Sequence, residues 1–286
     1  MSPSSDRDYV LGTHDEEVAR LGLQHRVWRP TVLECWHRAG ITVGSRVLDV
    51  GAGPGYATVD LAEIVGSTGL VVAVERSSRF VEAGQAACVA RGLAHVRIHE
   101  LDLMTDPLPS DGFDASWCRW VASFVSSPRT LIGKLASAVR VGGVAIFHEY
   151  IDYASWRYAP PRPLAEEFVR QVMASWRDSG GEPDIARALP PLLAEYGFVM
   201  REATPRVFCV RPRDHVWRWP AAFLSINLER LRELGRVDAA WLEAVREEFK
   251  AAEADPNTLM ITPMVLEIIA ERQQQSADRM SNGEHG

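Results

Sequence analysis

The 286-residue sequence predicts an α/β fold in which helices cover both faces of a mostly parallel sheet. Short apolar segments alternate with amphipathic segments across residues 44–150, which is the pattern of strands that are followed by crossover helices. The first apolar segment runs into a turn that contains three glycines. Hydrophobic residues make up 47% of the chain, which is enough to bury such a sheet on both sides.

The order of the elements follows from this alternation. A helical segment over residues 9–40 comes first, with Pro30 as a break or a first-turn residue. The predicted elements that follow are a strand at 46–50, a helix at 57–65, a strand at 70–75, a helix that starts at Ser77 or Ser78 and stops at Gly92, strands at 95–100 and 113–118, a helix capped by Ser127 with Pro128 in its first turn, and a strand at 144–149. The carboxyl ends of the parallel strands therefore meet at one crevice, which is where such sheets bind ligands.

The pattern becomes less regular after Tyr150. The sequence predicts helical insertions over 152–185 and 216–252, which together with the segment 9–40 would roof the crevice. The remaining predicted elements are a crossover helix at 189–196, further sheet at 207–210 and a last strand at 260–270. We expect residues 1–272 to form one domain, with 44–150 as its cofactor-binding core, and residues 273–286 to be a disordered tail.

Composition argues against several classes of partner. The formal net charge of −7 gives no general attraction to nucleic acid or to anionic lipid, and no apolar stretch is long enough to span a membrane. Four scattered cysteines without a Cys-x-x-Cys pair favour neither a metal site nor a disulfide framework. Together with an N-terminus that lacks a signal peptide, they predict a cytoplasmic protein that acts on a small molecule.

The glycine-rich turn is the central motif. Gly51, Gly53 and Gly55 allow a sharp bend that brings bare backbone close to a ligand, although an ordinary strand-to-helix turn could look the same. A dinucleotide fingerprint would need a small residue at position 56, where Tyr56 stands instead. The turn therefore does not predict a pyrophosphate cradle.

Acidic residues follow the turn at successive strand ends. Glu75 closes the second strand about 20 residues after the last glycine, the distance expected for a carboxylate that binds ribose hydroxyls. Asp102 follows the third strand, where it could accept a hydrogen bond from an adenine amino group, and Asp49 beside the turn could orient a cationic amino-acid group. Each acid alone could be a solvated or capping residue, but together they predict a nucleoside site.

The turn and these acids resemble the class I S-adenosylmethionine (SAM)-dependent methyltransferases. The segment 48–55, Leu-Asp-Val-Gly-Ala-Gly-Pro-Gly, is similar to the first motif of that family, Glu75 to its ribose acid and Asp102 to its adenine-side acid. Residues 104–113 and 142–143 also fit the spacing of the family. The resemblance covers residues 44–150 well and the whole chain loosely, and it is strongest to the ubiquinone/menaquinone-biosynthesis type and its natural-product relatives.

The resemblance implies a Rossmann-like, seven-stranded sheet whose last strand is antiparallel, and SAM as the cofactor, with S-adenosylhomocysteine (SAH) as its product. It also implies that Glu75 binds the ribose, that the turn 51–55 contacts the methionine end, and that Arg76 and Leu103 pack on the adenine. In related enzymes a tyrosine on the N-terminal segment folds over the cofactor, so we expect Tyr9 to cover the SAM carboxylate. The alternative for this segment is an ordinary amphipathic helix docked on the sheet.

The residues that would act on the acceptor are harder to identify, because methyl transfer needs little beyond positioning. His148 at the end of the fifth strand could remove a proton, although a buried histidine with one backbone bond is the alternative. Arg119 and Trp120 after the fourth strand could contact the methionine end or an acidic substrate. Tyr153 and His25 are further candidates for facing the pocket.

Nine tryptophans, several of them in the roofing segments, favour an aromatic-walled pocket and an aromatic or indole-like acceptor in secondary metabolism. Methylation at carbon, oxygen or nitrogen stays open, as does a homodimer supported by the helical segments. The alternatives are a NAD or flavin oxidoreductase, a non-enzymatic SAM-binding regulator and an RNA methyltransferase. The last often carries an Asn/Asp-Pro-Pro-Tyr/Phe motif after the fourth strand, where this chain reads Cys-Arg-Trp-Val.

Overall fold

A computed structural model describes residues 15–110 and 112–274 and confirms the predicted fold class. Its main sheet has seven strands in the order β3-β2-β1-β4-β5-β10-β7, and β10 runs antiparallel to both of its neighbours. The strands are β1 (Arg46–Val50), β2 (Leu70–Glu75), β3 (Val96–Glu100), β4 (Phe113–Arg119), β5 (Val139–Asp152), β7 (Phe198–Arg206) and β10 (Met264–Arg272).

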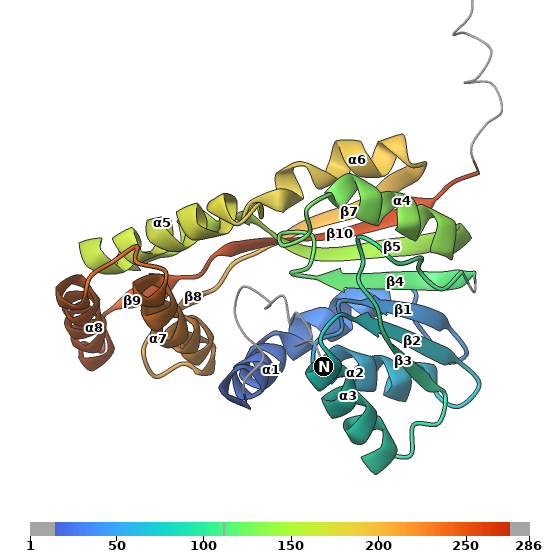
Figure 1. Cartoon of the computed structure of the whole chain (residues 1–286), viewed down its shortest axis with the longest axis horizontal. Coiled ribbons are helices and arrows are strands. Elements are labelled where there is room, and N and C mark those ends of the chain that lie inside the picture. Colours follow the sequence, from blue (N-terminus) through green and yellow to red (C-terminus); the bar gives the residue numbers. More distant parts are fainter. Residues whose placement is uncertain (1–14, 111, 275–286) are drawn as a thin grey trace, which may run out of the picture.

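Helices cover the two faces of this sheet (Figure 1). One face carries α1 (Asp15–Arg38), α2 (Tyr56–Val65) and α3 (Ser78–Ala90), and the other carries α4 (Pro128–Ala138) and α6 (Leu189–Glu195). The predicted caps of α3 and α4 are confirmed, because Ser77 and Ser127 accept hydrogen bonds from backbone amides of the first turns.

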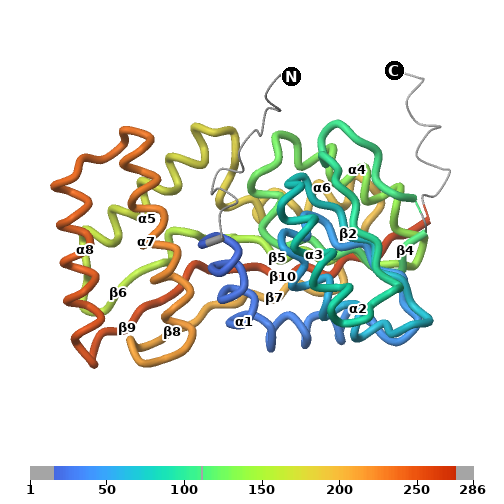
Figure 2. Tube along the Cα trace, turned by 60° about the horizontal axis from the view of Figure 1, so that its bottom comes forward, coloured from blue at the N-terminus to red at the C-terminus, as the bar shows by residue number. Residues whose placement is uncertain are grey.

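A second group of elements lies beyond the carboxyl ends of the parallel strands (Figures 1 and 2). The short strands β6 (Arg157–Ala159), β9 (Leu259–Ile261) and β8 (Cys209–Val210) form a three-stranded sheet beside α5 (Pro163–Asp178), α7 (Arg218–Glu233) and α8 (Ala239–Ala254). Single-turn helices η1 (Tyr153–Ser155), η2 (Ile185–Arg187) and η3 (His215–Trp217) complete the connections. We call α5, α7, α8 and this small sheet the lid.

The structure corrects several predicted bounds. Helix α1 continues through Pro30, because Trp28, Val32 and Trp36 are buried at four-residue spacing and hold the helix against the sheet. The predicted insertions at 152–185 and 216–252 are broken up: the first contains β6 and the second is two separate helices.

The two carboxyl-terminal strands also differ from the prediction. The predicted sheet at 207–210 contains the short strand β8 at Cys209–Val210, whereas the longer strand β7 ends before it at Arg206. The sequence did not predict β7, because an edge strand of mostly exposed and part-buried residues lacks an apolar signature. The expected strand at 260–270 is two strands in different sheets, with Pro263 between them.

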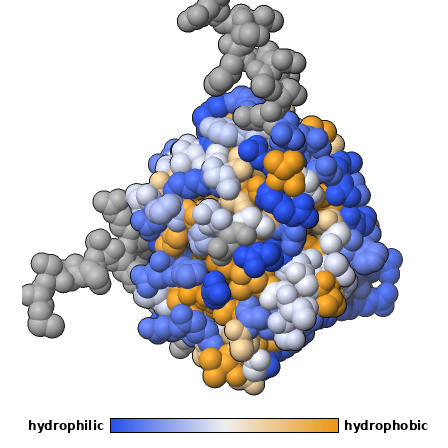
Figure 3. Space-filling view, turned by 90° about the vertical axis from the view of Figure 1, so that its right-hand side faces the viewer, coloured by the Kyte–Doolittle hydropathy of each residue, from blue (hydrophilic) through white to orange (hydrophobic). Residues whose placement is uncertain are grey.

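The sheet places alternate residues in two separate cores. On β4, Trp117 packs with the α1 and lid residues, whereas Cys118 packs with the residues beneath α4 and α6. The surface at the amino ends of the parallel strands is mostly hydrophilic, with apolar residues interspersed (Figure 3). In the described ranges, no helix has the length and apolar character that crossing a membrane requires.

Candidate functional site

A cavity of about 410 Å³ opens at the carboxyl ends of β1, β2 and β4. Its wall is drawn from residues 49–54, 56–57, 74–76, 101–105, 117, 119–121 and 124–126, together with Phe80 of α3 and with Leu21 and Gln24 of α1; the predicted residue Gly55 is not part of the wall. The site therefore lies at the edge of the sheet where the sequence predicts it.

The glycine turn forms the floor of this cavity. Gly53 has a φ of +56°, and its N–H donates to Glu75 Oε2 at 2.9 Å, which ties the turn to the end of β2. Gly55 has a φ of +82°, and a Cβ added there would lie 2.9 Å from the Cα of Gly84. Glycine at position 55 therefore allows the start of α2 to approach α3 closely.

Glu75 points toward the turn, as the prediction requires. Its other oxygen, Oε1, accepts hydrogen bonds from the backbone N–H groups of Arg76 at 2.8 Å and Ser77 at 2.9 Å. These three donors fix the carboxylate at the cavity wall with lone pairs left for a ligand. A fixed carboxylate at a strand end can accept hydrogen bonds from a diol.

The other two predicted acids also line the cavity. Asp49 is fully buried, and Thr58 Oγ1 donates to its Oδ2 at 2.6 Å. Burial raises the pKa of Asp49 to about 6, against the opposing effects of this hydrogen bond and of the Arg119 charge. Asp102 accepts a hydrogen bond from Met104 N at 2.7 Å, and its neighbour Leu103 lies on the same wall.

Arg119 ends β4 and faces the cavity. Its guanidinium lies 5.9 Å from the ring centre of Trp117 and 5.3 Å from that of Trp120. The atom Nη1 is buried and has no hydrogen-bond partner among the described residues. Burial lowers the pKa of Arg119 to about 10, so the group stays cationic near neutral pH.

Trp120 adopts an unusual backbone conformation for a residue with a side chain, with a φ of +52°. Its ring stacks with that of Tyr150, at 5.5 Å between ring centres, and with that of Trp219 of α7, at 5.9 Å. Because Trp120 also lines the cavity, this stack joins the cavity wall to the lid.

The loop after Trp120 is held by Glu149, a residue that the sequence analysis did not single out. The Oε1 atom of Glu149 accepts hydrogen bonds from Val121 N and Ala122 N at 2.8 Å each, and Oε2 accepts from Ser123 Oγ at 3.0 Å. Glu149 is fully buried, and burial raises its pKa to about 7. The sequence predicts a strand that ends at position 149, but it does not show where the side chain of Glu149 points.

The structure corrects the expected positions of two candidate acceptor-side residues. His148 lies outside the cavity wall, enclosed by the rings of Trp28, Trp117 and Trp120 at 4.8–5.7 Å. Burial lowers its pKa well below the usual value, and neither ring nitrogen has a partner among the described residues. These surroundings disfavour a base, because a protonated ring there would be desolvated.

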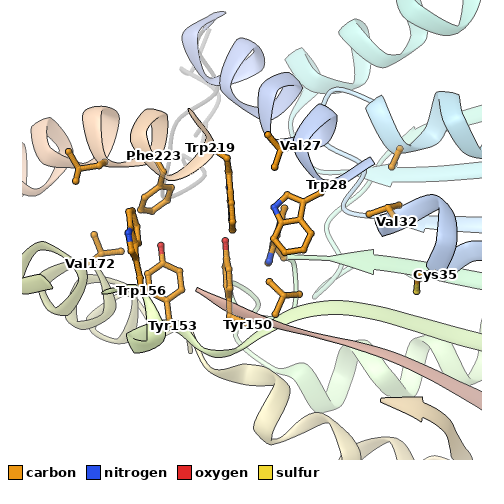
Figure 4. Close-up of a cluster of buried hydrophobic side chains, with 14 of the residues drawn as sticks. Val27, Trp28, Val32, Cys35, Tyr150, Tyr153, Trp156, Val172, Trp219 and Phe223 are labelled. Carbon is orange, nitrogen blue, oxygen red and sulfur yellow. The ribbon is translucent and has the colours of Figure 1, made fainter. Parts of the chain in front are cut away.

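Tyr153 also lies outside the cavity wall, and burial raises its pKa well above the usual value. It packs against the rings of Tyr150, Trp156 and Trp176 at 4.7–6.3 Å. Figure 4 shows its ring among those of Trp156 and Phe223, between β5 and α7. Tyr153 therefore belongs to the packing between the sheet and the lid.

His25 is likewise absent from the cavity wall, but it touches a wall residue. Its Nδ1 lies 3.2 Å from Arg119 Nη2, and its Nε2 lies 3.0 Å from Asp60 Oδ2. Tyr9 lies outside the described residues. The predicted wall residues that the structure brings together are Asp49, Gly51, Gly53, Glu75, Arg76, Asp102, Leu103, Arg119 and Trp120.

The cavity residues fit the functional groups of SAM. Glu75 and Asp102 offer acceptors for ribose hydroxyls and an adenine amino group. Arg119 Nη1 is a buried donor with no partner among the described residues, and such a donor suits a carboxylate. Among the residues that the structure describes, no group of three histidine, cysteine or acidic side chains could hold a metal ion.

Comparisons with known proteins agree with this geometry. Residues 47–143 match the family described as "Methyltransferase domain". Demethylmenaquinone methyltransferase from Anoxybacillus flavithermus is 24% identical over 198 residues, covering 65% of this chain and 82% of that protein. The uncharacterized methyltransferase YcgJ of Bacillus subtilis is 28% identical over 127 residues, covering 44% of this chain and 46% of that protein.

The chain thus spans about half the length of curated relatives such as YcgJ. The crystal structure of YcgJ superposes with a TM-score of 0.56 at 14% sequence identity, covering 87% of this chain and 99% of that chain, which shows the shared fold. The matched motif region, the strand order and the cavity agree: residues 47–143 match a methyltransferase domain, and the chain is similar to demethylmenaquinone methyltransferase and to YcgJ.

Proposed function

We propose that this chain transfers a methyl group from SAM to a small organic acceptor. The observation that carries the proposal is the placing of Glu75 and Arg119 in the wall of a single cavity. A carboxylate tied to a glycine turn and an arginine whose Nη1 donor has no partner among the described residues suit the ribose and the carboxylate of one ligand. The family match over residues 47–143 supports the same function.

Each of three side chains binds a different group of the cofactor. Glu75 accepts from the ribose, Asp102 accepts from the adenine amino group, and Arg119 donates from Nη1 to the carboxylate. When bound, SAM supplies a methyl group on a positively charged sulfur, so the chemistry needs no activation by the protein. Positioning of the acceptor in line with that methyl is worth roughly 7–11 kcal/mol in well-oriented reactions.

The walls of the cavity support an apolar, planar acceptor. Trp120 and Phe124 lie on the wall, and the stack of Trp120 with Trp219 connects it to the lid. Flat rings pack well on such walls and exclude water from the methyl. An aromatic or indole-like acceptor of secondary metabolism is therefore the substrate class that we propose, with displacement at carbon, oxygen or nitrogen.

Calorimetric titration tests the cofactor part of the proposal. We expect SAH to bind the wild type with one-to-one stoichiometry and NAD⁺ not to bind. Glu75→Gln should weaken SAH binding about tenfold or more, because it replaces a charged acceptor that contacts the ligand. Glu82→Gln on the exposed surface of α3 is the matched control and should leave affinity unchanged.

An assay of SAH release tests the transfer itself. Purified protein is given SAM with a panel of indoles, phenols, quinols and aliphatic amines, and SAH is quantified by mass spectrometry. Turnover is expected with planar aromatic acceptors. Turnover confined to the aliphatic amines would contradict the acceptor class, and tight binding of NAD⁺ with none of SAH would contradict the proposed function.

A further inference from the structure

Arg119 contacts the N-terminal helix α1 through His25, which is in turn bound to Asp60. His25 of α1 stands between Arg119 of β4 and Asp60 of α2, with contacts of 3.2 Å and 3.0 Å. Asp60 also accepts hydrogen bonds from Arg29 Nε at 2.7 Å and Arg29 Nη2 at 3.2 Å. His25 and Asp60 are both largely buried.

We propose that His25 and Asp60 are positioning residues that aim Arg119 at the carboxylate of the cofactor and so couple the docking of α1 to cofactor binding. This inference rests on the proposed function. It assigns His25 a role different from the proton transfer that the sequence suggests.

The hydrogen-bond donors in this chain determine the tautomer of His25. A guanidinium has only donors, so the contact from Arg119 Nη2 requires Nδ1 of His25 to be an acceptor. The ring proton must then lie on Nε2, where it is donated to Asp60 Oδ2. A neutral imidazole in this tautomer satisfies both neighbours, whereas a second proton on Nδ1 would face the guanidinium.

The net effect of the surroundings of His25 also favours the neutral ring. Asp60 on α2, Arg29 on α1 and Arg119 on β4 are the charged groups that face it, and the ring of Tyr56 stacks on it at 5.8 Å. Burial lowers the pKa of His25, and the two arginines add to this effect while Asp60 opposes it. His25 is therefore neutral at pH 7, and protonation at lower pH breaks its bond to Arg119.

The contact with His25 limits the directions in which the Arg119 guanidinium can point. With Nη2 held by His25, Nη1 remains a buried donor without a partner among the described residues. Loss of His25 would free the guanidinium to rotate over the rings of Trp117 and Trp120. The cofactor carboxylate would then have to order Arg119, at a cost in affinity.

The test compares three variants by calorimetry with SAH at pH 8.0 and pH 5.5. His25→Ala removes the link, and His25→Asn restores an acceptor near Nδ1 that does not titrate. His37→Ala, at an exposed position of the same helix, is the control. At pH 8.0 we expect His25→Ala to weaken SAH binding about tenfold, His25→Asn to restore most of it, and His37→Ala to have no effect.

The pH dependence separates positioning from a purely structural role. Wild-type affinity should fall between pH 8.0 and pH 5.5 more than that of His25→Asn, and the ¹⁵N spectrum of the wild type should show His25 with its proton on Nε2. SAH affinity of His25→Ala within twofold of the wild type, equal pH dependence in His25→Asn, or a proton on Nδ1 would overturn the inference. Failure of the wild type itself to bind SAH would instead overturn the proposed function.

Discussion

Arg119 is a cation whose hydrogen-bond donors are only partly satisfied by the described residues. Its Nη1 atom has no partner among the described residues, and burial lowers its pKa to about 10. A buried charge of this kind costs folding free energy unless a ligand satisfies it. Such a group in a cavity wall is therefore better explained by ligand binding than by stability.

Arg119→Met tests this explanation, because it keeps an apolar chain against the rings of Trp117 and Trp120 and removes the charge. We expect the ligand-free variant to unfold at the same or a higher temperature than the wild type, and SAH affinity to fall about tenfold or more. Calorimetry and thermal unfolding measure the two effects. A lower melting temperature with unchanged affinity would show that Arg119 is structural.

Sequence reasoning located the cavity residues that belong to a motif, and it failed for those that do not. Asp49, Glu75 and Asp102 lie at strand ends whose positions the apolar pattern determines, so their arrangement could be predicted. His148 also lies near the end of a predicted strand, but the alternation of side chains along β5 directs it beneath Trp28 of α1. Which helix covers a side chain is a tertiary property that no local pattern contains.

At the scale of elements, the close approach of α2 to α3 depends on Gly55. Gly55→Ala would place a methyl group 2.9 Å from Gly84 in a backbone conformation that disfavours any side chain. We expect a loss of at least about 1–2 kcal/mol in the free energy of unfolding, from the left-handed conformation alone. Chemical denaturation measures this loss. Gly92→Ala, with a φ of +67° and open space around it, is the control that isolates the cost of the close contact.

The loop between β4 and α4 depends on Glu149 of β5. Burial raises the pKa of Glu149 from 4.5 to about 7, so its native state holds a proton that the unfolded state has lost. The stabilising contribution is therefore present at low pH and is lost as pH rises through about 7. Glu149→Gln keeps an acceptor for Val121 N and Ala122 N but does not titrate.

We therefore expect Glu149→Gln to gain stability relative to the wild type between pH 5 and pH 8, by up to about 3 kcal/mol. Urea denaturation of both proteins at several pH values measures the difference. A constant difference across this range would mean that Glu149 is ionised throughout, held by its three strong donors.

At the scale of the whole molecule, an aromatic cluster joins the sheet to the lid. Trp28 of α1 contacts Trp219 of α7 at 5.0 Å, and Trp219 Nε1 donates to Gln24 Oε1 of α1 at 3.1 Å. The rings of Tyr150 and Phe223 continue this cluster between β5 and α7 (Figure 4). The lid and the sheet therefore share one core, and His148 lies within it.

Because His148 is buried in this shared core, the free energy of unfolding depends on pH. Burial lowers the pKa of His148 well below 6.5, so the unfolded chain binds a proton that the native state excludes. The stability contribution of neutral His148 is present above pH 6.5 and is lost as pH falls below it. Wild-type protein should lose stability from pH 7 to pH 5 more steeply than His148→Phe, as measured by urea denaturation. Parallel slopes would show that His148 titrates normally.

The part of the fold in which strands and helices alternate was predictable from the sequence. Strands β1 to β5 and helices α2 to α4 follow from apolar periodicity, glycine turns and serine caps. The lid was predicted only as helical insertions, because β6, β8 and β9 are three residues or fewer and pair across long sequence separations. Such short strands are defined by their partners and carry little local signal.

A crystal structure of the wild type with SAH tests the central claim most directly. We expect the ribose hydroxyls within hydrogen-bond distance of Glu75, the carboxylate on Arg119 Nη1 and the adenine beside Asp102 and Leu103. SAH bound elsewhere, or bound in the cavity with Glu75 turned away from its ribose, would contradict the claim that this cavity is the cofactor site.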